Sequence, residues 1–233
     1  MSSADSASPR VWERCGEIAR LGADSRSPRY IAAVSDLIYY ERNLPHRLPP
    51  GEAIFLTFRL AGSLPRTVVE QLQANTELAQ QRHAIESAQR YAEQKKYFGR
   101  FDAQLAKGEY GPMYLRQPAI ASLVADSLRY FDGTAYDLLC YCLMPNHVHM
   151  VVLLLDEAPP LVKTLQRLKS YTATQANKLL SRSGAFWQAE SYDHIVRKGE
   201  LERIVAYILE NPAKAGLVEA WEQWPHTYLA ASL

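Results

Sequence analysis

The chain has 233 residues, 48% of them hydrophobic and 22% charged, with a formal net charge of +1. These values suit a globular protein with a substantial core, and they exclude a uniformly basic polyanion binder. No apolar run approaches the roughly 18 residues of a membrane span, and three irregularly spaced cysteines exclude a disulfide framework. The N-terminus lacks the basic-then-apolar order of a signal peptide, so we expect a cytoplasmic protein without a membrane partner.

The first part of the chain predicts an extension, a strand and a helical insertion. Residues 1–45 begin with a Ser- and Ala-rich stretch, and we interpret them as an N-terminal extension or arm. Residues 52–62, EAIFLTFRLAG, are rich in β-formers and predict a strand. The segment at about 65–110 is rich in Glu, Gln, Ala, Lys and Arg. It therefore predicts a helical insertion of one or two long helices that are polar over much of their surface.

The rest of the chain alternates between helices and strands. The predicted elements are a helix ending near Asp132, a strand and turn at 134–146, a strand at 147–155, a helix at 159–182, an extended segment at 184–199 and a helix at 200–218. Pro145 and Asn146 favour a tight turn, so the two strands beside them should pair antiparallel. The last helix should be interrupted at Asn211 and Pro212, because the residue before a proline is pushed out of helical geometry. The order β, α, β, β, α, β, α predicts an α+β, ferredoxin-like antiparallel sheet with helices on one face.

The run MPNHVHMVV carries the first residues that could perform chemistry. His147 and His149 are two positions apart in a predicted strand, so both side chains point to one face and can share a metal ion. An isolated H-x-H pattern is more often structural. Here two polar rings beside Met150, Val151 and Val152 need partners, and a metal ion would supply them.

Two tyrosine–amide pairs could meet the histidine pair. Tyr207 and Asn211 lie four residues apart, so they share one face of a predicted helix. Tyr171 and Gln175 have the same spacing in the preceding helix. Spacing alone leaves both pairs open. The alternative for Tyr207 is a tyrosine that packs on the core, and the alternative for Tyr171 is a partly exposed helix tyrosine between basic residues.

Two further clusters have structural alternatives of their own. Cys140 and Cys142 lie on the neighbouring strand and could complete a Cys₂His₂ zinc site, although cysteines on an apolar strand are more often core residues. His194 is another candidate site residue, with a structural histidine as its alternative. Residues 161–200 carry seven lysines or arginines against three carboxylates, a local charge of +4. Such a surface can neutralise phosphates. The predicted DNA-binding residues are Lys163, Arg167, Lys169, Lys178 and Arg182, each of which could instead lie on a solvated helix face.

In combination, MPNHVHMVV, FWQAESYDHIVR and YILENPAKAGLV followed by WEQWP resemble the REP-associated tyrosine transposases of the single-tyrosine HUH superfamily. The resemblance covers roughly residues 40–228. It implies that residues 46–233 form an HUH transposase-like catalytic domain that carries the helical insertion. The implied activity is metal-dependent cleavage and rejoining of single-stranded DNA at hairpin, REP-like sequences, with DNA as the partner and a monomer or a homodimer as the assembly.

The resemblance also separates the two tyrosines. In this family the nucleophile lies in the helix with the Y-I-x-x-N-P pattern, which implies that Tyr207 forms the 5′-phosphotyrosine intermediate. His147, His149 and Asn211 are the implied ligands of Mg²⁺ or Mn²⁺. Glu210 places a carboxylate beside the implied amide ligand, and whether it joins the site stays open. A non-catalytic DNA-hairpin-binding protein on the same fold is the alternative function.

Overall fold

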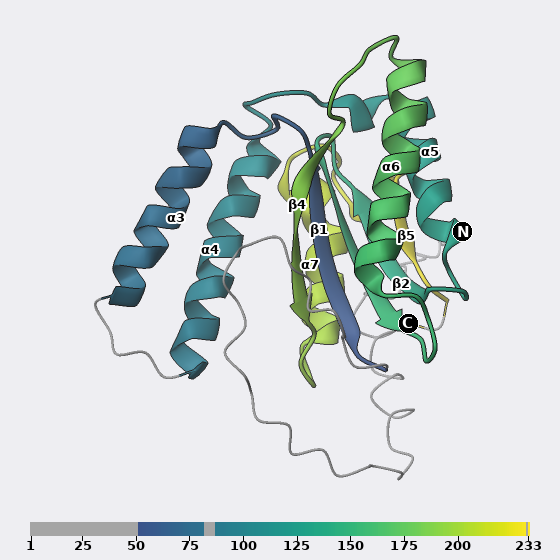
Figure 1. The fold of residues 1–233 in the computed structure, drawn as a ribbon. Helices are drawn as coiled ribbons and strands as arrows, with labels where there is room; N and C mark the ends of the chain where they lie inside the picture. The colour runs from purple at the N-terminus through teal and green to yellow at the C-terminus, as the bar shows by residue number, and fades with distance from the viewer. Residues whose placement is uncertain (1–50, 82–86, 232) are drawn as a thin grey trace, which may run out of the picture.

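The computed structural model describes residues 51–81, 87–231 and 233, so the predicted extension at 1–45 lies outside the described residues. Its centre is a five-stranded antiparallel sheet with the strand order β4-β1-β3-β2-β5 (Figure 1). The strands are β1 (Ala53–Leu60), β2 (Tyr136–Leu143), β3 (His147–Leu154), β4 (Trp187–Ile195) and β5 (Thr227–Leu229). Strands β1 to β4 have the order and connections of a ferredoxin-like fold, and β5 extends the sheet beyond β2. The predicted α+β, ferredoxin-like class is therefore confirmed. The prediction that helices cover only one face of the sheet is wrong, because buried clusters under helices lie on both faces.

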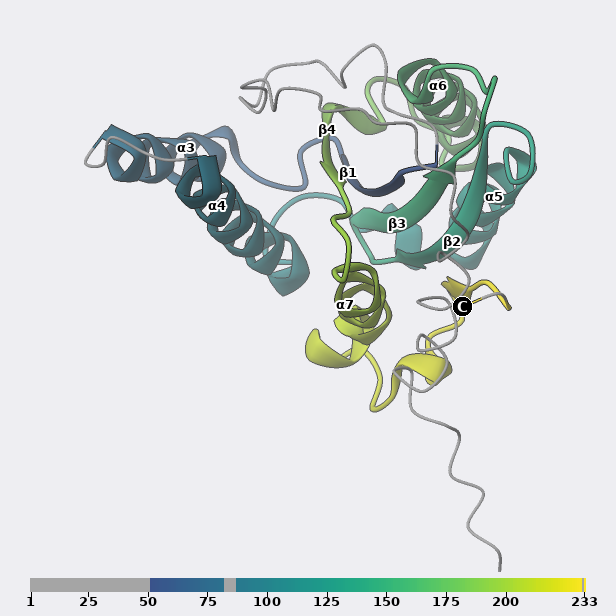
Figure 2. The ribbon, with the colours of Figure 1, turned by 90° about the horizontal axis from the view of Figure 1, so that it is seen from below.

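Two helices cover one face of this sheet. They are α5 (Pro118–Tyr130) and α6 (Leu161–Leu179), which lie side by side in Figure 2. Pro118 occupies the first turn of α5, where its missing N–H costs no hydrogen bond. The apolar stripes of both helices face the sheet, with Ile120, Val124, Leu128, Leu161, Leu165, Leu168 and Ala176 buried. The third helix, α7 (Leu201–Lys214), packs on the opposite face.

The central strands are apolar on both faces because helices cover both of them. In β1, Ile54 and Leu56 belong to the core under α5 and α6, whereas Phe55 belongs to the core under α7. A strand buried on both sides is a nearly continuous apolar run rather than an alternating one. Strand β3 has the same character, and its polar residues His147 and His149 point to the α7 face.

Helix α7 corrects one prediction. The expected interruption at Asn211 and Pro212 is wrong, since α7 continues through Pro212 to Lys214. Pro212 lies in the last turn, where the loss of one backbone donor disturbs little of the helix. The end is stabilised by Ala215 N–H donating to the Asn211 carbonyl and Leu217 N–H donating to the Pro212 carbonyl, each at 2.9 Å.

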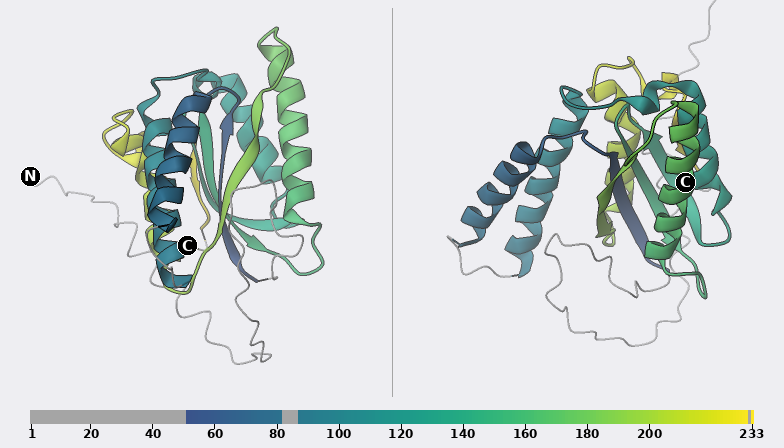
Figure 3. Two further views of the ribbon diagram at one scale, coloured as in Figure 1. Left: turned by 60° about the vertical axis from the view of Figure 1, so that its left-hand side comes forward. Right: turned by 45° about the horizontal axis from the view of Figure 1, so that its top comes forward.

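The segment between β1 and α5 contains two long helices. They are α3 (Arg66–Gln81) and α4 (Ser87–Lys107), followed by the short helix η1 (Tyr114–Arg116). Both long helices lie beside the β4 edge of the sheet, and α3 is the outer of the two (Figures 1 and 3). The inner helix reaches the α7 face, where the ring of Phe98 stacks on Tyr192 of β4 at a centroid distance of 4.1 Å. Within the described residues no helix is long and apolar enough to cross a membrane.

The two ends of this helical segment meet at a pair of glycines. Gly111 has φ +69°, and a methyl group on it would lie 2.1 Å from the Gly62 carbonyl oxygen. We expect Gly111→Ala to lower the free energy of unfolding in urea by about 1 kcal/mol for the left-handed backbone. Overpacking against Gly62 should cost a further 1–3 kcal/mol or so. Gly199→Ala is the control, because Gly199 has φ +81° with no atom within 4 Å of the added methyl. Equal losses in the two variants would contradict a packing role for Gly111.

Candidate metal centre and nucleophile

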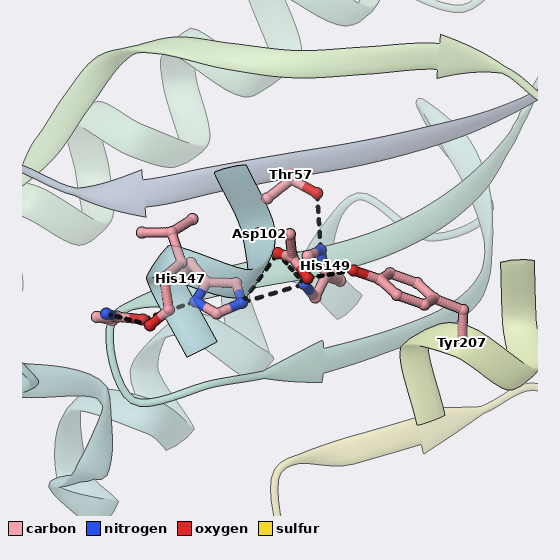
Figure 4. A network of polar contacts seen from close by, with 7 residues as sticks. Thr57, Asp102, His147, His149 and Tyr207 are labelled. Atoms are coloured by element: carbon pink, nitrogen blue, oxygen red, sulfur yellow. Dashed lines mark hydrogen bonds and ion pairs between the residues drawn. The ribbon is translucent and has the colours of Figure 1, made fainter. Parts of the chain in front are cut away.

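The two histidines of β3 form the centre of the site. Both rings are fully buried and point to the α7 face of the sheet (Figure 4). Their Nε2 atoms lie 3.0 Å apart. On the other side of the second ring, Thr57 Oγ1 lies 2.7 Å from His149 Nδ1, because Thr57 is the direct neighbour of His149 on β1. His147 and His149 therefore lie on one face of β3, as predicted.

The proton of His147 can be placed from its neighbour Asn146. The Asn146 Nδ2 group donates to the Leu105 carbonyl at 3.0 Å, so its Oδ1 faces His147 Nδ1 at 2.6 Å. An amide oxygen only accepts, which puts the proton of His147 on Nδ1 and leaves a lone pair on Nε2. Burial, followed by the neighbouring His149, lowers the pKa of His147 to about 3 against an opposing effect of Asp102. This ring is therefore a neutral imidazole, the form that binds metal ions.

A third ligand-type side chain comes from the helical insertion. Asp102 lies on α4, and its Oδ1 is 3.1 Å from His149 Nε2 and 3.6 Å from His147 Nε2. The side chain is almost completely buried. Burial raises the pKa of Asp102, but the adjacent histidines together lower it more. The pKa of this carboxyl therefore lies well below its usual range, and the group is ionised. Ligand atoms of Asp102, His147 and His149 all lie within 4.8 Å of one another, so this group could hold a metal ion.

The hydroxyl of Tyr207 reaches the same point from α7. It donates a hydrogen bond to Asp102 Oδ2, and its ring centroid lies 5.9 Å from that of His149 (Figure 4). Burial raises the pKa of Tyr207, and the charge and hydrogen bond of Asp102 raise it further. The phenol is therefore protonated at rest and oriented toward the histidines.

The other candidates on α7 lie around Tyr207. Asn211 is buried, and its Nδ2 has no hydrogen-bond partner within the described part of the chain. Its side chain lies near enough to Tyr207 to oppose the rise in that pKa. Its role as a metal ligand stays a prediction. Glu210 is exposed and pairs with Lys214 at 2.8 Å, one turn further along the helix.

The competing pair lies elsewhere. Tyr171 and Gln175 are on α6, which covers the opposite face of the sheet, and Tyr171 is 56% exposed. Neither of the two side chains is brought to the histidines. The sheet therefore separates the two tyrosines that spacing alone could not distinguish.

The cysteines and His194 are near the site but not in the cluster. Within the described residues, the group of metal-ligating side chains around the histidines contains Asp102 and neither cysteine. Burial raises the pKa of the Cys142 thiol to about 12. His194 Nε2 instead lies 3.5 Å from Glu200 Oε2, just before α7.

The predicted DNA-binding residues lie on or just after α6, across the sheet from the histidines. Lys163, Arg167 and Lys178 are exposed. The Lys169 ammonium donates to Ser191 Oγ at 2.6 Å and to backbone carbonyls of β4. Arg182 donates to Asn177 Oδ1 at 3.0 Å. The structure does not bring these five cations to the metal centre, and their contact with DNA stays a prediction.

Comparisons with known proteins show what part of this chain is similar to. Residues 126–211 match the family model described as "Transposase IS200 like". The matched segment includes both histidines, Tyr207 and Asn211, but it does not include Asp102. The class that the match indicates is thus a transposase family.

Two further comparisons found proteins with more specific names. A protein of Haemophilus influenzae with that name is 24% identical over 102 residues. The aligned part is 40% of this chain and 58% of the relative, so little more than half of the relative is covered. The solved structure of a REP-associated tyrosine transposase bound to a REP hairpin has 14% identity and a TM-score of 0.43, covering 84% of this chain and 82% of that one. The two sequence matches confirm the family resemblance predicted from the motifs.

Proposed function

We propose that the chain is an HUH transposase that uses Tyr207 and a divalent metal ion to cleave and rejoin single-stranded DNA at hairpin sequences. The observation that carries this proposal is the contact of one carboxylate, Asp102, with the Tyr207 hydroxyl and with both histidines. A nucleophile beside a cluster of metal-ligating side chains is what metal-assisted attack on a phosphodiester requires. The names of the matched proteins, which refer to transposases and to a REP hairpin, support the choice of substrate.

The proposed reaction follows from the position of the phenol. The Tyr207 oxygen attacks the scissile phosphorus, a P–O bond to the phenol forms, and the P–O3′ bond breaks. The phenol loses its proton as this bond forms, the leaving 3′ oxygen takes up a proton, and the products are a 5′-phosphotyrosine and a free 3′-OH. The covalent bond conserves the phosphodiester energy, so rejoining needs no ATP. The Asp102 carboxylate orients the phenol by accepting its hydrogen bond.

The donor set fits a divalent cation. Two imidazole nitrogens and an ionised carboxylate converge, which suits Mn²⁺, and the oxygen ligand also suits Mg²⁺. When bound, the cation supplies positive charge that stabilises the phosphate oxygens in the transition state and offsets the charge of Asp102. His147, His149 and Asp102 would hold it, and Asn211 remains a proposed further ligand.

A labelled DNA hairpin with a single-stranded flank tests the function. The wild-type chain with Mn²⁺ should form a covalent adduct that survives a denaturing gel. His147→Ala and His149→Ala should each lower the rate of adduct formation by at least about 100-fold. Cys140→Ser should leave the rate unchanged, since the metal-ligating cluster does not include that thiol. Hairpin binding by the wild-type chain without any adduct would instead support a non-catalytic hairpin-binding protein.

A further inference from the structure

A cavity of about 130 Å³ lies next to the histidine pair, at the β2–β3 turn. Its walls are the C-terminal end of α4, η1 with the residue before it, the turn itself and the residues that follow α7. His147 is part of the wall, so the cavity adjoins the candidate metal centre. The reaction proposed above gives this space no role.

The charged residues on the cavity wall are all cationic. Lys107 and Arg116 are both exposed, and no carboxylate of the described residues lines the cavity. Within residues 51–81 and 87–231, neither cation forms a salt bridge. Two such cations next to a site for phosphodiester cleavage are complementary to a backbone phosphate.

Part of the cavity lining is apolar. Met113 and Met144 contribute thioethers, which make favourable contacts with aromatic rings. The polar groups of Asn146 are already used, because its Nδ2 donates to the Leu105 carbonyl and its Oδ1 accepts from His147. The two thioethers therefore offer contact area for a ring.

The size of the cavity matches a single ring. A protein cavity of about 150 Å³ accommodates benzene. We propose that this cavity holds one unpaired nucleobase directly flanking the scissile phosphate, and that Lys107 and Arg116 bind the phosphate of that nucleotide. This inference rests on the proposed function and adds a binding site for the nucleotide beside the cleaved bond.

Abasic substitutions in the DNA test the base. Two hairpin substrates carry an abasic residue on either side of the cleaved bond. One of them should form the adduct with the wild-type chain about tenfold more slowly than intact DNA, the size of one lost stacking contact. Ala106→Phe fills the cavity from α4, so it should slow adduct formation on intact DNA. In this variant the abasic substrate should react at the same rate as intact DNA, because the cavity can no longer hold a base.

A second pair of variants tests the phosphate contact without filling the cavity. Lys107→Ala with Arg116→Ala should weaken hairpin binding, and the decrease of log affinity with log salt should become less steep by about 1, because one phosphate loses its cations. Arg66→Ala with Lys96→Ala removes two exposed cations that do not line the cavity, and it should leave the slope nearly unchanged.

The outcomes separate this inference from the function on which it rests. If the wild-type chain forms no adduct on any hairpin, the proposed function fails. If it forms the adduct at equal rates on intact and on both abasic substrates, only the cavity assignment is overturned. An abasic effect that is equally large in wild type and in a folded Ala106→Phe variant also overturns the assignment.

Discussion

Tyr207→Phe should abolish the covalent DNA adduct completely, because phenylalanine has no oxygen to attack phosphorus. The variant also removes the hydrogen bond to Asp102, at a cost of about 1–3 kcal/mol for a buried charged acceptor left without that donor. Thermal unfolding therefore has to show that the variant is folded at the assay temperature. Hairpin affinity in a filter-binding assay should stay within a few-fold of wild type, since the proposed phosphate contacts remain.

Tyr171→Phe is the matched control for this result. Tyr171 is exposed on α6, on the opposite face of the sheet, and has the same spacing to Gln175 as Tyr207 has to Asn211. The control should form the adduct at the wild-type rate. An adduct that persists in Tyr207→Phe and disappears in Tyr171→Phe would overturn the nucleophile proposed here.

Asp102→Ala should weaken Mn²⁺ binding more than any change on α7. The carboxylate is the anionic member of the cluster, and its Oδ1 faces both imidazole Nε2 atoms. We expect the dissociation constant from calorimetry to rise at least about 100-fold, the upper range for changes in the support of a metal ligand. Calorimetry with the metal alone reports this loss without DNA and without turnover.

Asn211→Ala separates the two candidate ligands. If Asp102 is the main oxygen ligand, Asn211→Ala should change the Mn²⁺ dissociation constant by less than about tenfold. Asp102→Asn keeps an oxygen near the histidines but removes the charge, so its affinity should lie between those of Asp102→Ala and wild type. A large loss in Asn211→Ala with a near-normal Asp102→Ala would restore the ligand set implied by the family resemblance.

Most of the fold could be predicted because its signals are local. Strands β1 and β3 are apolar runs bounded by turn residues, and the stripes of α5 and α6 repeat at helical spacing. The histidine pair could be predicted for the same reason, since two residues of one strand share a face whatever surrounds them. The pairing of β1 with β3 then placed Thr57 beside His149, which no local pattern contains.

Asp102 could not be identified from local patterns. It lies 45 residues before His147, in a helix of polar composition where one aspartate resembles any solvated acid. A signal was nevertheless present in FGRFDAQL. Phe98, Phe101 and Leu105 form an apolar stripe at helical spacing, and Asp102 lies within it. A carboxylate on the buried face of an otherwise polar helix needs a partner, which is the reason to search for one.

The local charge of residues 161–200 did not predict where these residues lie in the fold. The charge of residues 161–200 is correctly counted, but charge along the chain does not say which face of a sheet it covers. The sheet places α6 away from the histidines, and two of the five predicted cations, Lys169 and Arg182, hold parts of the fold together.

The contact between Gly62 and Gly111 has a consequence for how the chain can vary. The polypeptide leaves the sheet region at Gly62 and returns to it at Gly111, which lies in contact with Gly62. The helices between the two glycines therefore form an insertion whose ends meet. Segments whose ends meet in this way can change length with little effect on the strands that flank them. This insertion nevertheless places Asp102 beside the two histidines. A segment whose two ends meet beside the sheet thus supplies the only carboxylate, among the described residues, in the metal-ligating cluster around the histidines.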